Sequence, residues 1–402
     1  MRQRAHRSLL VDGLKAVAAM LIVLHHLAFY GPMADHLRPV VPQLWQWLVD
    51  DARMAVQVFL VVGGFLAARS LAPAGRLMVD AGLGATLRLR FLRLALPYYL
   101  VLLVAIACNE LARGWMTHPS ISAPPTLLQL LAHALLLHDL LGYEALSAGL
   151  WYVAIDMQLF LLMAVLLWLG EQVDRGRRRP SRPGQVPYTP LMTTALLLVS
   201  ALGLASLLHF NRDFGWDAWG VYFFGAYALG ALAWWASTWP RPLCCLAAMA
   251  ALTIGILLLE FRERLLLALL VALALGLEAS IARRRGTPLP ARLGGAGPEQ
   301  DDAAASRHPM VFVRNSLERS IQGACAISYA LFLIHFPVCL VVNAAFTRFM
   351  PPNAGWQAIG LFVALSMSVA AAAAFHAGVE VRLHRLLARP RADSMAHAPP
   401  VS

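Results

Sequence analysis

Charged residues are scarce in this sequence, and their scarcity indicates the class of protein. Only 14% of the 402 residues are Asp, Glu, Lys or Arg, whereas a soluble globular domain carries about 25%. The chain is 59% hydrophobic, with a mean hydropathy of +0.62. These values exclude a chain made mostly of soluble domains and predict an all-α polytopic membrane protein.

The sequence also lacks the cysteine spacings of zinc sites and redox motifs. Its cysteines lie in or beside apolar runs, without a C-x-x-C pair: Cys108, Cys244, Cys245, Cys325 and Cys339. We therefore interpret them as small buried hydrophobic residues and expect no metal and no bound cofactor. No A-x-A cleavage site follows the first apolar run, which is longer than a signal-peptide core, so we expect a retained helix. No internal repeat is detectable.

The net charge of +11 could suggest a nucleic-acid partner. The basic residues, however, cluster at the ends of apolar runs, which is typical of membrane topology and not of a phosphate-binding groove. We therefore expect membrane lipids, and no nucleic acid, around this chain.

Ten apolar runs approach the length of about 20 residues that a bilayer requires. They are Leu9–Tyr30, Met54–Leu71, Phe91–Leu111, Leu150–Leu169, Leu191–His209, Ala218–Trp235, Leu243–Leu259, Leu265–Ile281, Ala324–Phe346 and Gln357–Val379. A further run, Leu127–Leu137, is about half a span and is expected to be re-entrant or interfacial.

Basic clusters alternate with these runs and predict that both termini are cytoplasmic. The clusters are at residues 2–7, 76–93, 175–179, 283–285 and 382–391. We expect one transmembrane domain over residues 1–390, containing a partly disordered cytoplasmic loop at 283–318, and a disordered tail at 391–402. The sequence leaves the oligomeric state open.

The first run carries Asp12, Lys15, His25 and His26, and ionisable groups inside a membrane usually have a function or a partner. Lys15 and His26 are eleven residues apart, so they lie roughly 20° from eclipsed on a helix and about 16 Å apart along its axis. His25 points some 80° away from Lys15. One helix face therefore presents a cation near one end and an imidazole deeper in the membrane.

Three further sites carry polar groups in apolar surroundings. Arg90 and Arg93 share a helix face at the predicted cytoplasmic boundary, where they would bind phosphate or anchor the helix to lipid head groups. Asp156 lies roughly 10 Å inside its span. It is either a functional residue or the partner in a hydrogen bond to a neighbouring helix. His335 lies near mid-membrane before Pro337, as a site residue or a satisfied core histidine.

Five stretches, in order, resemble the membrane acyltransferase 3 family. They are Val11–Lys15 with His26, Val58–Leu66, Arg90–Arg93 with Pro97–Tyr99, Leu150–Gln158 and Ser328–Pro337. The sequence departs from the family in three places. Asp156-Met157 replaces the usual adjacent glutamates, Gly63-Gly64 replaces Ser-Gly, and Lys15 replaces arginine.

The resemblance implies an O-acyltransferase of a bacterial inner membrane, with acyl-CoA, expected to be acetyl-CoA, as co-substrate. A sugar or cell-envelope glycan hydroxyl would be the acceptor. By this resemblance Lys15, Arg90 and Arg93 would hold the donor phosphates, and His26 would be the general base or a transient acyl carrier. Asp156 would orient that imidazole. The secondary candidates are Asp12, Tyr329 and His335.

Two other classes of protein use similar residues. A transporter also places ionisable groups in the membrane, although the sequence shows neither a repeat nor paired broken helices. A regulatory scaffold with degenerate chemistry would explain the missing second carboxylate beside Asp156.

Overall fold

The computed structural model describes residues 8–79, 82–177, 193–286 and 309–388, with residues 309–315 described by their backbone alone. All regular structure within these ranges is helical. The long helices are α1 (Leu9–Phe29), α4 (Val56–Leu71), α5 (Leu83–Trp115), α7 (Leu150–Arg177), α8 (Thr194–Leu208), α9 (Gly220–Thr238), α10 (Pro242–Leu259), α11 (Glu263–Arg284), α12 (Pro309–Phe349) and α13 (Ala354–Phe375). The short ones are α2 (Pro32–Leu37), α3 (Pro42–Asp50), α6 (Leu127–Ala134) and α14 (Val381–Ala388).

Nine helices in the described ranges are long and apolar enough to cross a membrane, which confirms an all-α polytopic protein. One of the ten predicted spans, Ala218–Trp235, corresponds to α9, which is not among these nine helices. Most of α9 is buried against other helices. Its glycine, tyrosine and tryptophan residues therefore face protein, where strongly apolar side chains are not required.

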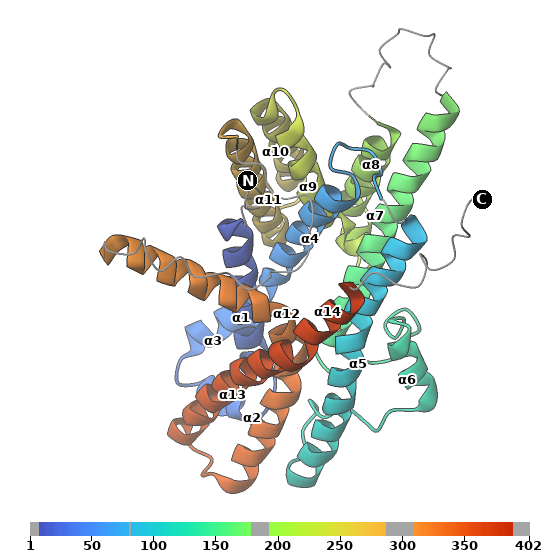
Figure 1. Ribbon diagram of the computed structural model, residues 1–402. Helices are drawn as coiled ribbons and strands as arrows, with labels where there is room; N and C mark the ends of the chain where they lie inside the picture. The colour runs from blue at the N-terminus through green and yellow to red at the C-terminus, as the bar shows by residue number, and fades with distance from the viewer. Residues whose placement is uncertain (1–7, 80–81, 178–192, 287–308, 389–402) are drawn as a thin grey trace, which may run out of the picture.

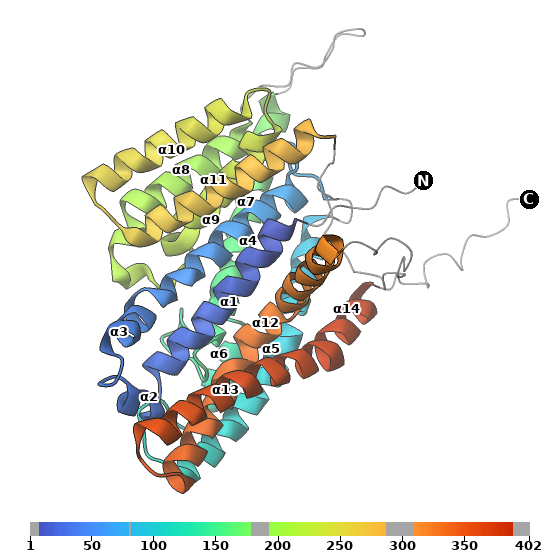
Figure 2. The same ribbon diagram turned by 90° about the vertical axis from the view of Figure 1, so that its left-hand side faces the viewer.

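Two hydrophobic clusters divide the helices. The first cluster contains residues of α4 and of α7, α8, α9, α10 and α11. The second contains residues of α5, α12 and α13. Helices α1 and α7 contribute residues to both clusters. Figure 2 shows α8 to α11 on one side and α12 and α13 on the other, with α1 and α4 between them. Polar residues on α1 and α7 therefore lie where the two clusters meet.

The chain between α5 and α7 forms a hairpin, residues 117–149, beside the middle of α5 (Figure 1). Tyr99, the central residue of α5, donates its hydroxyl to the carbonyl of Ala134 at the end of α6, at 2.5 Å. Leu146 then approaches Asn109 on the return path, with its carbonyl 3.4 Å from Nδ2. Leu127–Leu137 thus forms a short helix and a turn beside α5, and it is not among the helices long enough to cross a membrane. Its re-entrant or interfacial position stays a prediction.

Two predicted boundaries are wrong. Helix α5 begins at Leu83, eight residues before the predicted span Phe91–Leu111, so the stretch that leads to Arg90 is also helical. Helix α12 begins at Pro309, so the last part of the predicted 283–318 loop is helical. The loop prediction rested on glycine and proline, which are absent from residues 310–322. Residues 287–308 and 391–402 lie outside the described residues.

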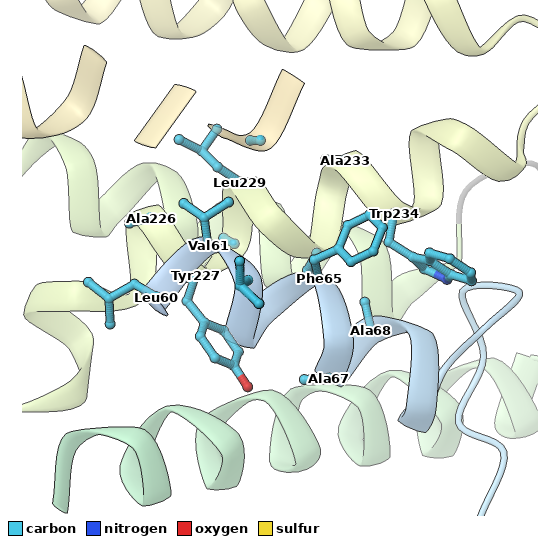
Figure 3. Close-up of a cluster of buried hydrophobic side chains, with 14 of the residues drawn as sticks. Leu60, Val61, Phe65, Ala67, Ala68, Ala226, Tyr227, Leu229, Ala233 and Trp234 are labelled. Carbon is cyan, nitrogen blue, oxygen red and sulfur yellow. The ribbon is translucent and has the colours of Figure 1, made fainter. Parts of the chain in front are cut away.

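Helices α4 and α9 cross closely, as Figure 3 shows around Phe65 and Trp234. A Cβ added to Gly64 would lie 1.8 Å from the carbonyl oxygen of Tyr227, and one added to Gly230 would lie 1.9 Å from that of Val61. Small residues permit such close approach of two backbones in a membrane. The paired glycines therefore set the spacing between α4 and α9.

Gly64→Ala is expected to lower the melting temperature in detergent, because the added methyl group must push two backbones apart. Overpacking of this kind costs roughly 1–3 kcal/mol. Gly255→Ala is the matched control, because Gly255 is also helical and a Cβ there meets nothing within 4 Å. The control should melt at or slightly above the wild-type temperature. Equal melting temperatures for the two variants would contradict the close crossing.

Candidate active site

His26 of α1 and His335 of α12 form a buried pair at the seam between the two hydrophobic clusters. Nδ1 of His26 lies 2.6 Å from Nε2 of His335, and the ring planes are inclined by only 8°. The two residues are 8% and 0% exposed. Further along the same helix pair, the Cys325 thiol donates to Oδ1 of Asp12 at 3.1 Å. These contacts fix α1 against α12 at two levels.

Hydrogen bonding determines the tautomer of each imidazole. Nδ1 of His335 lies 2.9 Å from the carbonyl oxygen of Leu331, which only accepts, so this nitrogen carries the proton. Nε2 of His335 then carries a lone pair and accepts a hydrogen bond from Nδ1–H of His26. Nε2 of His26 is left with a lone pair and has no hydrogen-bond partner within the described part of the chain. His26 therefore presents a basic nitrogen whose ring is oriented by a second histidine.

His25 faces a different neighbour, as the helix geometry of the sequence predicts. Its Nδ1 lies 3.0 Å from the carbonyl oxygen of Leu48 in α3. The side chain is 9% exposed, similar to His26. Adjacent histidines at one depth thus have separate partners, and only His26 contacts α12 through its ring nitrogen.

Arg90 of α5 forms a salt bridge from Nη2 to Oδ2 of Asp156 on α7. The prediction that Asp156 orients the imidazole of His26 is therefore wrong in its geometry, because His335 holds that position. A carboxylate that is 13% exposed needs a counter-charge, and Arg90 supplies it. The pair joins Arg90, near the start of α5, to Asp156, near the start of α7. The position of Arg90 at the membrane boundary stays a prediction.

The surroundings leave part of this pair accessible. The Arg90 side chain is 34% exposed, and its guanidinium carbon lies 5.0 Å from the ring centre of Phe160. A Cβ on Gly63 would lie 3.2 Å from Cε2 of Tyr227 and 4.0 Å from Oδ1 of Asp156, so this glycine borders the carboxylate. Nε of Arg90 and Nε of Arg93 are both buried without a hydrogen-bond partner among the described residues. Each guanidinium group thus keeps a donor that no described residue uses, and the exposed part of Arg90 is where an anionic ligand could reach it.

Aromatic rings lie between the arginines Arg90 and Arg93, which we call the cationic pole, and the histidine pair His26 and His335. Tyr152, one turn from Asp156, contacts Phe332 with ring centres 5.1 Å apart, and Phe332 lies 6.3 Å from His335. Tyr329 donates its hydroxyl to the carbonyl of Leu94 on α5 at 3.1 Å. Tyr329 and His335 are separated by six residues, or about 9 Å along α12. His335 therefore lies about 9 Å along α12 from Tyr329, which is within electrostatic reach of Arg90.

A family of acyltransferase domains matches residues 9–375. The chain belongs to the acyltransferase 3 family. No curated protein and no solved structure gives a match to the chain. The family match covers both the His26–His335 pair and the Arg90–Asp156 pair, so these residues lie within a multi-pass membrane acyltransferase.

Lys15 of this acyltransferase, the only lysine in the chain, is half-buried on α1. It lies within electrostatic reach of Glu380, whose Oε2 is 2.6 Å from Nδ1 of His376. These two residues bound a π-helical turn at the end of α13, and such turns are frequent at functional sites. Glu380 is buried, at 5% exposure. Neither His376 nor Glu380 is among the candidates drawn from the sequence, although their i, i+4 spacing was a usable signal.

The acyltransferase shows no group of three His, Cys, Asp or Glu side chains suited to a metal within the residues described. Of the sequence candidates, the structure joins His26 to His335 and Asp156 to Arg90. It places Tyr329 beside α5 and Asp12 against Cys325. Arg93 lies three residues beyond Arg90 on the same helix.

Proposed function

We propose that the chain transfers an acyl group, expected to be acetyl, from acyl-CoA to a hydroxyl of a sugar or cell-envelope glycan. The observation that carries this proposal is the His26–His335 pair, in which Nε2 of His26 is an oriented base without a hydrogen-bond partner among the described residues. A base of this kind suits removal of a proton from a hydroxyl group.

In the proposed reaction, Nε2 of His26 takes the acceptor proton as the hydroxyl oxygen attacks the thioester carbonyl. The C–O bond forms, the C–S bond breaks, and the thiolate leaves and takes the proton back from the imidazolium. The products are an ester and a free thiol. His335 stabilises the imidazolium, because its Nε2 accepts the hydrogen bond from Nδ1 of His26.

The donor's phosphates would bind at the cationic pole. The buried Nε atoms of Arg90 and Arg93 are available as donors, and Lys15 adds a third cation on α1. Asp156 holds Arg90 in place until the phosphates share its guanidinium group. The flexible arm between the phosphates and the thioester of acyl-CoA would then extend along α12 from the level of Tyr329 toward His335, about 9 Å further along the helix.

The proposed location is a bacterial inner membrane with both termini in the cytoplasm. The alternation of basic clusters along the sequence supports this orientation. In Figure 2 the start of α1 and α14 lie on the same side of the molecule. The donor pole would then face the cytoplasm, and the acceptor would approach from the opposite side.

Sealed membrane vesicles of both orientations test the proposal, because acetyl-CoA does not cross a membrane. With radiolabelled acetyl-CoA outside, inside-out vesicles should form alkali-labile labelled esters and release thiol. Right-side-out vesicles should do neither until they are permeabilised. Vesicles without the chain provide the background. Absence of ester in permeabilised vesicles would contradict an acyltransferase, and label in right-side-out vesicles alone would contradict the orientation.

A further inference from the structure

Three fully buried polar side chains lack partners beside the hairpin. Within the described residues, the Tyr98 hydroxyl, both ring nitrogens of His138 and Oγ of Ser147 form no hydrogen bond. These residues are 0%, 0% and 1% exposed. Folded proteins leave few buried polar groups unpaired, so three such groups around one hairpin require an explanation.

The three groups are close together. The rings of Tyr98 and His138 are 6.5 Å apart between centres, and His138 stacks on His133 at 4.1 Å. Nε2 of His133 in turn accepts a hydrogen bond from the backbone N–H of Leu146, the residue before Ser147, at 3.2 Å. The groups therefore form one cluster, which we call the hairpin cluster (Tyr98, His138 and Ser147).

The hairpin reaches the proposed catalytic pair at Gly149, two residues after Ser147 of the hairpin cluster. A Cβ on Gly149, at the end of the hairpin, would lie 3.7 Å from Cε1 of His335 and 2.4 Å from the carbonyl oxygen of Phe332. Glycine is thus required where the hairpin touches α12. A ligand at the hairpin cluster would lie next to the residues that hold the His26 imidazole.

The cluster favours a hydroxyl-bearing ligand. Burial, reinforced by His133, lowers the pKa of His138 to about 3, so its ring is neutral at physiological pH. Burial and the nearby Asp217 raise the pKa of Asp139 to about 6. Its Oδ2, 3.5 Å from Nε2 of His138, makes no hydrogen bond with the ring. A neutral imidazole and two hydroxyls all donate and accept, which matches the hydroxyl groups of a sugar.

We propose that the hairpin cluster is the acceptor-binding site, and that the hairpin moves to admit the acceptor and closes to bring its hydroxyl to His26. This inference rests on the proposed acyltransferase function. Movement is necessary because the unpaired atoms are closed off in the present arrangement. Leu136 at the hairpin tip has φ +58°, a conformation unusual for leucine. Such strain is typical of segments that move in function.

Adjacent tyrosines of α5 provide a matched test. Tyr98→Phe removes an unpaired hydroxyl, so its melting temperature should equal or exceed that of the wild type. Tyr99→Phe removes a hydroxyl that is paired with Ala134, so its melting temperature should fall. Each variant replaces the wild-type protein in the cells that naturally produce it, because the natural acceptor is present there. After permeabilisation, labelled acetyl-CoA is added, and alkali-labile esters are counted per folded molecule.

Tyr98→Phe should reduce ester formation about threefold to tenfold, the effect of one hydrogen bond to the ligand. Tyr99→Phe should lose clearly less ester formation per folded molecule, because its hydroxyl bonds to the hairpin backbone and not to the acceptor. Full activity of Tyr98→Phe, or equal losses in both variants, would overturn the acceptor site. If the wild type itself released no thiol from acetyl-CoA, the proposed function would fail first, which separates the two outcomes.

Discussion

His26→Ala is expected to lower acyl transfer by about 10²–10⁴-fold, the usual contribution of a general base. The variant loses the only ring nitrogen of the pair that faces away from protein partners, because both nitrogens of His335 are engaged with Leu331 and His26. The measurement is ester formation from labelled acetyl-CoA at matched amounts of folded protein in the membrane.

His25→Ala is the control within the same helix. His25 has the same depth and nearly the same burial as His26, but its ring bonds to the carbonyl of Leu48. We expect a small loss of stability and activity within a few-fold of wild type, since one hydrogen bond is removed. Equal losses in the two variants would mean that α1 matters only for packing. Near-normal activity of His26→Ala would remove this residue from the mechanism.

Arg90→Ala is expected to destabilise the protein by about 3 kcal/mol, because it leaves the carboxylate of Asp156 without a partner. The value lies at the lower end of the range for buried pairs, since a third of the Arg90 side chain is accessible. Thermal melting of Arg90→Ala and Asp156→Ala, and of the double variant, measures the coupling of the pair. The double variant should recover part of the stability but not the use of the donor.

Arg93→Ala separates donor binding from folding. No carboxylate pairs with Arg93 among the described residues, and its Nε atom is without a partner. We therefore expect near-normal melting and a KM for acetyl-CoA raised about tenfold or more, as a charge-assisted hydrogen bond contributes about 1.5–3 kcal/mol. Unchanged KM in Arg93→Ala, together with lost expression, would mean that the arginines only anchor α5.

Helix periodicity in the sequence was sufficient to place residues within a single helix. It put Lys15 and His26 on one face of α1 and turned His25 away, and the separate partners of the two histidines agree with this. The length of the run Leu127–Leu137 also excluded it as a membrane span, because a segment of half a span cannot cross a bilayer. These features depend only on spacing, length and hydropathy along adjacent residues.

The boundaries were less accurate where a helix continued beyond its apolar part. Leucine and arginine both favour helix, so α5 extends back to Leu83 through a stretch that hydropathy alone assigns to a loop. The family resemblance likewise marked His335 and Asp156 as motif residues but did not give their partners.

The sequence by itself determined an all-α membrane protein, its acyltransferase motifs and the faces of its first helix. Only the tertiary structure decided that His335, 309 residues away, orients His26 and that Asp156 pairs with Arg90. It alone also enclosed Tyr98, His138 and Ser147 without partners. The reason is physical: periodicity reports the face and depth of a residue within its own helix. Which faces meet is decided by packing between helices that are distant in the chain.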